Sequence, residues 1–314
     1  MACTLLMSSW DDGLFIVSGD GVRQEQAACS LKALASDGQG GALVIVDGHA
    51  LCRRASDGRW STLVATQETA LACCVRVGEI VYVGTDEARI LSLDAGGTLR
   101  PLPGFAQVAG RDAWYAGAAV VEGRLVGPPL GVRSIDATAD GRVLLANVHV
   151  GGIPRSTDGG ASWQPSIDIE TDVHEVRAHP QRPDVVAAAT AVGLALSHDG
   201  GASWHIEARG LHATHGSAVA FLGDDVLVSA AHDPFDSRGA VYRRHVDEGG
   251  PLAPVGGGLP VWLEGGVDTA CIASKGALAA IADRRGNLYL SHDQGLQWSC
   301  VATRLGHASS LLIV

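Results

Sequence analysis

Four of the twelve histidines in this chain stand where they could share a metal ion. They are His149, His174, His212 and His232. All four come from three consecutive units of the repeat described below, and imidazole nitrogens are common ligands of transition metals. Asp172 or Glu175 could act as a further ligand or orient an imidazole. We predict a site for one divalent transition metal ion of unspecified identity. Because no HxH or HExxH spacing forces these histidines together, hydrogen-bonded polar residues lining a wet channel remain the alternative.

Basic residues near the starts of several predicted strands could bind an anion. Aligning the repeat units on a buried apolar residue gives a set of equivalent positions, which are Lys32, Ala72, Arg133, His174, Ser217 and Ala270. Lys32, Arg133 and also Arg177 would attract a carboxylate or a phosphate, so we expect a small polar or anionic ligand. Arg133 would hold its anionic group while Asp172 or Glu175 moves a proton, which predicts a metal-assisted hydrolase or lyase. Simple solvation of these basic side chains is the alternative.

Three of the seven tryptophans fall outside the repeated turn that accounts for the other four. Trp10, Trp114 and Trp262 map to loops on the face where we expect the ligand. Their rings could form a stacking wall for a ring-bearing ligand, or they could simply anchor the loops. No P-loop and no GxGxxG after a strand appears, so we expect no nucleotide cofactor.

The overall composition excludes several classes of partner. The chain has 23 basic and 34 acidic residues, a net charge of −11, and no dense basic cluster. We therefore expect neither nucleic acid nor an anionic membrane as a partner. No uninterrupted apolar stretch approaches the ~18 residues of a membrane span, and the first ten residues lack a signal-peptide pattern. These features predict a cytoplasmic protein.

An internal repeat organises the chain. Four segments share a turn that ends in tryptophan, and they are 56–60, 156–163, 197–204 and 291–298. The first is shortened, and the others read Ser-x-Asp-x-Gly-x-x-Trp. The tryptophans Trp163 and Trp204 are 41 residues apart, which indicates units of about 40 to 50 residues. The clearest unit has apolar or alternating runs at 173–178, 185–190, 193–197 and 203–208, typical of four short strands.

The repeated turn resembles the Asp-box, or BNR repeat, of the sialidase-like β-propellers. In addition, segments 147–152 and 172–180 look like those of bacterial BNR-like propeller proteins that carry no assigned activity. The resemblance implies an all-β propeller fold with a site on its top face near His149 and His174. It does not imply one function, since propellers of this kind serve several.

Counting units predicts a single domain, 1–314, folded as a seven-bladed β-propeller of four-stranded antiparallel blades. Six blades begin their inner strands near residues 31, 70, 132, 173, 217 and 269. The seventh would combine strands at 4–8, 13–17 and 22–26 with an inner strand at 307–314, which closes the ring without an open edge. Segment 104–131 is expected to be a loop over the top face. An eighth blade hidden in this segment is the alternative.

Two other classes of function remain open. The resemblance would allow sialidase chemistry, but the usual Arg-Ile-Pro segment near the N-terminus is absent and three of four tyrosines lie in strand patterns, so this activity is disfavoured. A two-carboxylate glycoside hydrolase could use Asp86 with Glu87, or Asp172 with Glu175. The remaining alternative is a non-catalytic scaffold with a protein partner.

Overall fold

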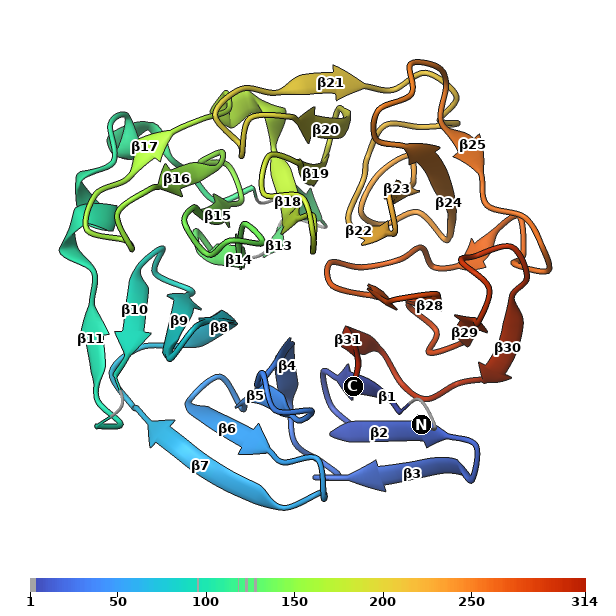
Figure 1. Ribbon diagram of the computed structural model, residues 1–314, viewed down its shortest axis with the longest axis horizontal. Helices are drawn as coiled ribbons and strands as arrows, with labels where there is room; N and C mark the ends of the chain where they lie inside the picture. The colour runs from blue at the N-terminus through green and yellow to red at the C-terminus, as the bar shows by residue number, and fades with distance from the viewer. Residues whose placement is uncertain (1–3, 95, 118, 122–123, 127–128) are drawn as a thin grey trace.

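The chain forms a ring of seven antiparallel sheets around a central axis (Figure 1). The computed structural model describes residues 4–94, 96–117, 119–121, 124–126 and 129–314. The predicted all-β, seven-bladed propeller is confirmed. Among the described residues, no helix has the length and apolar character needed to cross a membrane.

Each blade runs from an inner strand at the axis to an outer strand at the rim. In chain order, the first three blades after the N-terminal strands are β4 (Leu31–Ser36), β5 (Ala42–Val46), β6 (Ala50–Arg54) and β7 (Trp60–Ala65); β8 (Leu71–Val77), β9 (Ile80–Thr85), β10 (Ile90–Leu93) and β11 (Leu99–Pro101); and β14 (Val132–Ala137), β15 (Leu144–Val148), β16 (Pro154–Ser156) and β17 (Gln164–Pro165). The next three are β18 (Val173–Ala178), β19 (Val186–Thr190), β20 (Gly193–Ser197) and β21 (His205–Glu207); β22 (Val219–Leu222), β23 (Asp225–Ala230), β24 (Arg238–His245) and β25 (Ala253–Pro254), with β26 (Leu263–Glu264) also paired to β24; and β27 (Ile272–Lys275), β28 (Leu278–Ala282), β29 (Leu288–Ser291) and β30 (Ser299–Ala302).

The seventh blade joins the two ends of the chain. It contains β1 (Leu5–Ser9), β2 (Leu14–Ser18), β3 (Gly21–Glu25) and, as its inner strand, β31 (Ala308–Ile313). Leu5 pairs with Ile313 and Ser8 with Ser310, so the last strand completes the blade that the first three begin. This closure was expected, and it leaves no gap in the ring.

The described part of segment 104–131 does not form an eighth blade. The chain here has two short 3-10 helices, η1 (Pro103–Gln107) and η2 (Arg111–Ala113), and the hairpin β12 (Ala119–Val121) to β13 (Arg124–Val126). Residues 118, 122–123 and 127–128 of the segment lie outside the described residues. Phe105 anchors the segment, because its ring packs edge-on against Trp163 at 5.1 Å.

The repeated turns carry matching hydrogen bonds. In the turn at 156–163, Asp158 Oδ1 accepts from Ser156 Oγ at 2.8 Å and from the backbone N–H of Ser162 at 2.9 Å. The turns at 197–204 and 291–298 repeat both contacts at 2.8 to 2.9 Å. Gly160 has a φ of 90°, a conformation that glycine adopts without a steric penalty. These turns therefore stabilise themselves with local contacts.

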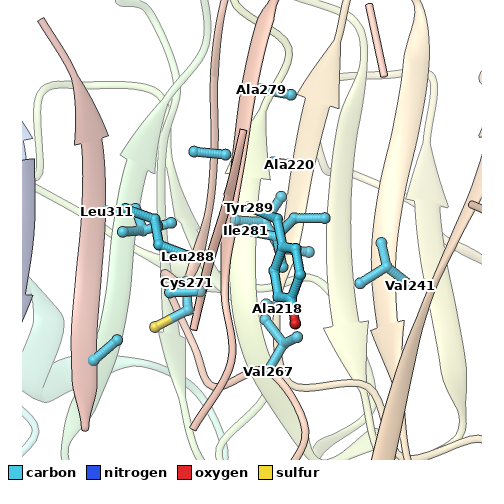
Figure 2. Packing of buried hydrophobic residues seen from close by; sticks show 14 of the residues in the cluster. Ala218, Ala220, Val241, Val267, Cys271, Ala279, Ile281, Leu288, Tyr289 and Leu311 are labelled. Atoms are coloured by element: carbon cyan, nitrogen blue, oxygen red, sulfur yellow. The ribbon is translucent and has the colours of Figure 1, made fainter. Parts of the chain in front are cut away.

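The hydrophobic core lies between neighbouring blades. Figure 2 shows part of one cluster, in which Val241 of β24, Ile281 of β28 and Leu311 of β31 come from three adjacent blades. Because each sheet buries both faces against its neighbours, the ring holds every inner strand at a set distance from the axis. This rigid frame positions the site.

Candidate metal centre

A cavity of about 940 Å³ lies where the inner strands meet. Each of the seven blades supplies a lining residue near the start of its inner strand. These residues are Lys32, Ala72, Arg133, His174, Ser217, Ala270 and Ser309. The first six occupy the positions that became equivalent when the repeat units of the sequence were aligned.

Backbone bulges turn several of these side chains toward the cavity. In β18, Val173 pairs with Thr190 and Glu175 with Ala189, which leaves His174 between them without a partner. Arg133 in β14 has the same unpaired place. A bulge redirects a side chain out of the regular alternation of a strand. The bulges in β14 and β18 thus place Arg133 and His174 in the lining of the cavity.

His149, Asp172 and His174 form a compact group whose ligand atoms lie within 4.8 Å of one another. Nε2 of His149 is 3.2 Å from Asp172 Oδ1, and Nε2 of His174 is 3.6 Å from the same oxygen. Both imidazoles are buried and Asp172 is partly buried. Two nitrogens and one oxygen in this arrangement could hold a transition metal ion.

The contacts behind these ligand atoms suit metal binding. His174 Nδ1 lies 2.6 Å from the carbonyl oxygen of Gly216, which can only accept, so Nδ1 carries the proton and Nε2 presents its lone pair. His149 Nδ1 and Asp172 Oδ1 are buried and have no hydrogen-bond partner among the described residues. Buried polar atoms without partners are costly, and a bound cation would satisfy the Asp172 oxygen.

Local electrostatics favour the protonation state that a metal needs. Burial and the positive charge of Arg133 lower the pKa of His149 to about 3. Burial and the neighbouring His174 lower the pKa of His215, another lining residue, to about 4. Burial raises the pKa of Asp172, but the adjacent imidazoles outweigh that effect and the net pKa is lowered. Near neutral pH His149 and His215 are therefore neutral and Asp172 is ionised, as metal binding requires.

Asp172 reaches this position through an unusual backbone conformation. It ends the 3-10 helix η3 (Ile169–Thr171) with φ 50° and ψ 77° and directly precedes β18. Residues other than glycine rarely adopt a positive φ, and aspartate is among those that tolerate it best. Such strain is often found at functional sites, where the surrounding structure supports it.

Segment 104–131 covers one side of the group. Gly117 lies against the imidazole of His149, since a β-carbon added there would come within 2.3 Å of the ring. Tyr115 of the same segment also lines the cavity and is half exposed. Because Gly117 has no side chain, the segment can pack directly against His149 and bury it.

Arg133 is the one basic residue that lines the cavity without an ion pair among the described residues. Its Nη2 donates to Thr269 Oγ1 at 3.3 Å, and its other nitrogens have no hydrogen-bond partner there. Burial lowers the pKa of Arg133, while the charges of Asp172 and Asp268 oppose this change. Free guanidinium donors beside the metal group could bind an anion.

Two other predicted basic residues line the cavity in ion pairs. Lys32 lies 3.6 Å from Asp86, and Arg177 is bound to Glu175 at 2.6 Å. Glu175 itself is fully buried, does not line the cavity and also accepts from the backbone N–H of Val219. Its neighbour His174 occupies the unpaired position of the bulge. The Glu175 carboxylate therefore points between two blades and links them by its hydrogen bonds. This geometry does not support the proton-transfer role predicted for Glu175.

The other two predicted metal ligands lie outside the cavity lining. The rings of His212 and His232 are 5.3 Å apart, and Trp262 packs against His212 at 4.8 Å. His212 Nδ1 is bonded to the hydroxyl of Tyr242 at 2.8 Å. The structure thus divides the four predicted histidines into two groups, and only the pair with Asp172 faces the cavity.

The three tryptophans that were predicted to form a stacking wall do not lie together. Trp10 lines the cavity and is 38% exposed. Trp114 is only 7% exposed and packs with Phe105 and Arg111, so it anchors segment 104–131 and forms no part of a ligand wall. Trp262 is 41% exposed but lies beside His212, outside the cavity lining.

Sequence reasoning did not single out His307, a further polar residue of the cavity. His307 Nε2 lies 2.6 Å from Asp268 Oδ2, and Asp268 also binds Arg284. Like Asp172, both Asp268 and His307 stand in the link just before an inner strand. This shared place in the links is the signal that could have found His307.

Comparisons with known proteins show the fold. No family model matches the sequence, and no curated protein matches it. Among solved structures, "YCF48 bound to D1 peptide" is similar with a TM-score of 0.58 and 11% identity over 88% of this chain and 85% of that chain. A computationally designed protein, Ika8, gives 0.58 and 13% over 98% and 85%, and a chain of the nidogen/laminin complex gives 0.56 and 10% over 100% and 98%. Identities this low place the chain among β-propellers and show nothing finer.

Proposed function

We propose that this propeller binds one divalent transition metal ion through His149, Asp172 and His174, and a small anionic molecule beside it. The observation that carries the proposal is the approach of two buried imidazole nitrogens to one carboxylate oxygen, at 3.2 and 3.6 Å. The oriented Nδ1–H of His174 and the unpaired donors of Arg133 support it. We also propose that the repeated turns make the chain a relative of the BNR-type propellers.

The proposed chemistry is metal-assisted hydrolysis or elimination of a small anionic substrate. A metal held by two imidazoles and a carboxylate would act as a Lewis acid. Arg133 would bind and orient the anionic group of the substrate through its free guanidinium donors. The walls of the cavity would exclude bulk water and strengthen these charge interactions.

Elemental analysis of the purified protein tests the metal. We expect close to one equivalent of zinc, iron, manganese or another transition metal, and its loss in Asp172→Asn, which removes the charge with little change of shape. His205→Gln is the matched control, because this exposed histidine lies on the outer strand β21. A protein that neither contains metal nor takes it up after chelation and reloading would contradict the proposal.

The second candidate is a protein-binding scaffold. Two of the similar structures are, by their titles, YCF48 bound to a peptide and a complex of nidogen with laminin. In this chain Val261 is 72% exposed next to the half-exposed Trp262, which gives an apolar place at the rim. Protein without metal affinity, together with a partner whose binding is lost in Val261→Asp, would favour this candidate.

A further inference from the structure

We infer that His215 is a fourth ligand of the proposed metal ion, so that the centre contains three imidazoles and one carboxylate. The inference rests on the proposed metal site. His215 lines the same cavity, and the centre of its ring is 4.5 Å from that of His174. It lies in the link between β21 and β22, one blade farther along the ring than Asp172 and His174.

The backbone around His215 is held in place from three sides. Its N–H donates to the carbonyl of Ala231 at 3.2 Å, and its carbonyl accepts from the N–H of Ala231 at 2.9 Å. Just before it, Thr214 Oγ1 donates to Ala191 at 3.0 Å, and just after it the N–H of Gly216 donates to Thr190 at 2.8 Å. Hydrogen bonds to two neighbouring strand ends therefore fix the backbone of this link.

The same link also orients His174. The carbonyl oxygen of Gly216 accepts a hydrogen bond from His174 Nδ1 at 2.6 Å, and this bond orients His174 Nε2 toward Asp172. Backbone carbonyls commonly orient metal-binding histidines in this way. Two consecutive residues thus contribute to the proposed metal centre, since Gly216 orients His174 and His215 lies beside His174.

The imidazole of His215 is free to take part. Among the described residues neither ring nitrogen forms a hydrogen bond, in contrast to His174 and His212. His215 is not part of the group whose ligand atoms lie within 4.8 Å, so its ring must turn about its side-chain torsions to join. Four protein ligands match the coordination number that zinc and related ions prefer. With one carboxylate and neutral imidazoles, a divalent ion keeps a net positive charge that an anionic ligand would balance.

Cobalt(II) titration of chelator-treated protein tests the inference. The visible absorption of Co²⁺ reports both the affinity and the ligand set, so it separates a ligand from a residue that only supports the fold. We expect His215→Ala to weaken binding at least about tenfold and to change the visible bands. His212→Ala is the matched control, because it is also half-buried, lies three residues away in the same link and should bind cobalt like the natural protein.

The outcomes separate this inference from the proposed metal site. Equal affinity and an equal spectrum in His215→Ala would overturn the inference, and loss of cobalt in His149→Ala alone would leave the three-residue site standing. Natural protein that binds no cobalt would overturn both. If the alanine variant does not fold, His215→Gln keeps the polar volume and should still show the altered bands.

Discussion

The two histidine groups of this molecule have similar composition and different chemistry. The cavity group has His149 and His174 with Asp172, and the rim group has His212 and His232 with Asp236. In the cavity, two Nε2 atoms approach one carboxylate oxygen that has no other partner.

In the rim group, the carboxylate and both Nδ1 atoms are already occupied, while His212 Nε2 is buried without a hydrogen-bond partner among the described residues. His232 Nδ1 lies 2.9 Å from Asp236 Oδ2, which also accepts from the backbone N–H of His232. His212 Nδ1 is bonded to Tyr242, and the side chain of His232 is 64% exposed. The difference teaches that an unpartnered carboxylate oxygen within reach of two buried imidazoles, more than residue type, makes those imidazoles candidate ligands.

The sharpest way to break this comparison is to remove each group in turn. We expect the double variant His149→Ala/His174→Ala to lose zinc affinity by more than about 100-fold, because two of three ligands disappear. The double variant His212→Ala/His232→Ala should bind zinc within about twofold of the natural protein. Isothermal titration of chelator-treated protein measures both, and equal losses would mean that the groups do not differ.

Removing one cation from each region tests the anion site. Arg133→Gln should weaken binding of inorganic phosphate to the zinc-loaded protein by about tenfold, since it removes charged hydrogen-bond donors from the cavity. Arg238→Gln removes the guanidinium that lies 5.3 Å above Trp262 at the rim and should leave phosphate affinity unchanged. Phosphate bound equally by both variants would place the anion elsewhere.

A methyl group added beside His149 should have a smaller effect. In Gly117→Ala the new carbon would come within 2.3 Å of the imidazole, so the ring must shift and we expect zinc affinity to fall several-fold. Gly256→Ala is the control, because a β-carbon there meets nothing within 4 Å. Unchanged affinity in Gly117→Ala would show that segment 104–131 does not position His149.

The pH dependence of stability should show the smallest difference. The pKa values of His149 and His215, about 3 and 4, lie below the usual 6.5 of histidine, so below pH 6.5 the unfolded chain binds more protons than the folded one. Their contribution to stability is thus present above pH 6.5 and is lost as the pH falls toward 4.

Urea midpoints of metal-free protein at pH 7 and pH 4.5 measure this effect. His149→Gln should reduce the loss of stability on acidification. An unchanged slope in His149→Gln would show that this imidazole is as well hydrated as in the unfolded chain.

Much of the architecture was readable from the sequence because its signals are local. The turns at 156–163, 197–204 and 291–298 repeat the same residues and the same hydrogen bonds, so their spacing predicted the blades and the closure by β31. Segment 104–131 has no such repeat, which left an eighth blade open until the structure showed two 3-10 helices and a hairpin.

The repeat assigned each candidate residue to a blade, but it did not give the residue's distance from the axis. His174 and Arg133 reach the cavity because each occupies a bulge, whereas Glu175, one residue later, turns between blades to bind Arg177. Trp114 seemed equivalent to Trp10 in its loop, yet it packs against Phe105 in the core. No local pattern in the sequence distinguishes these cases.

The amino-acid sequence by itself determined the repeat and the loops that carry polar residues, since each depends on contacts within one turn or hairpin. Only the tertiary structure decided that His149, Asp172 and His174 lie together, and that His212 and His232 form a second group away from them. The physical reason is that closing the ring sets each residue's distance and direction from the axis, and a one-residue bulge changes that direction completely.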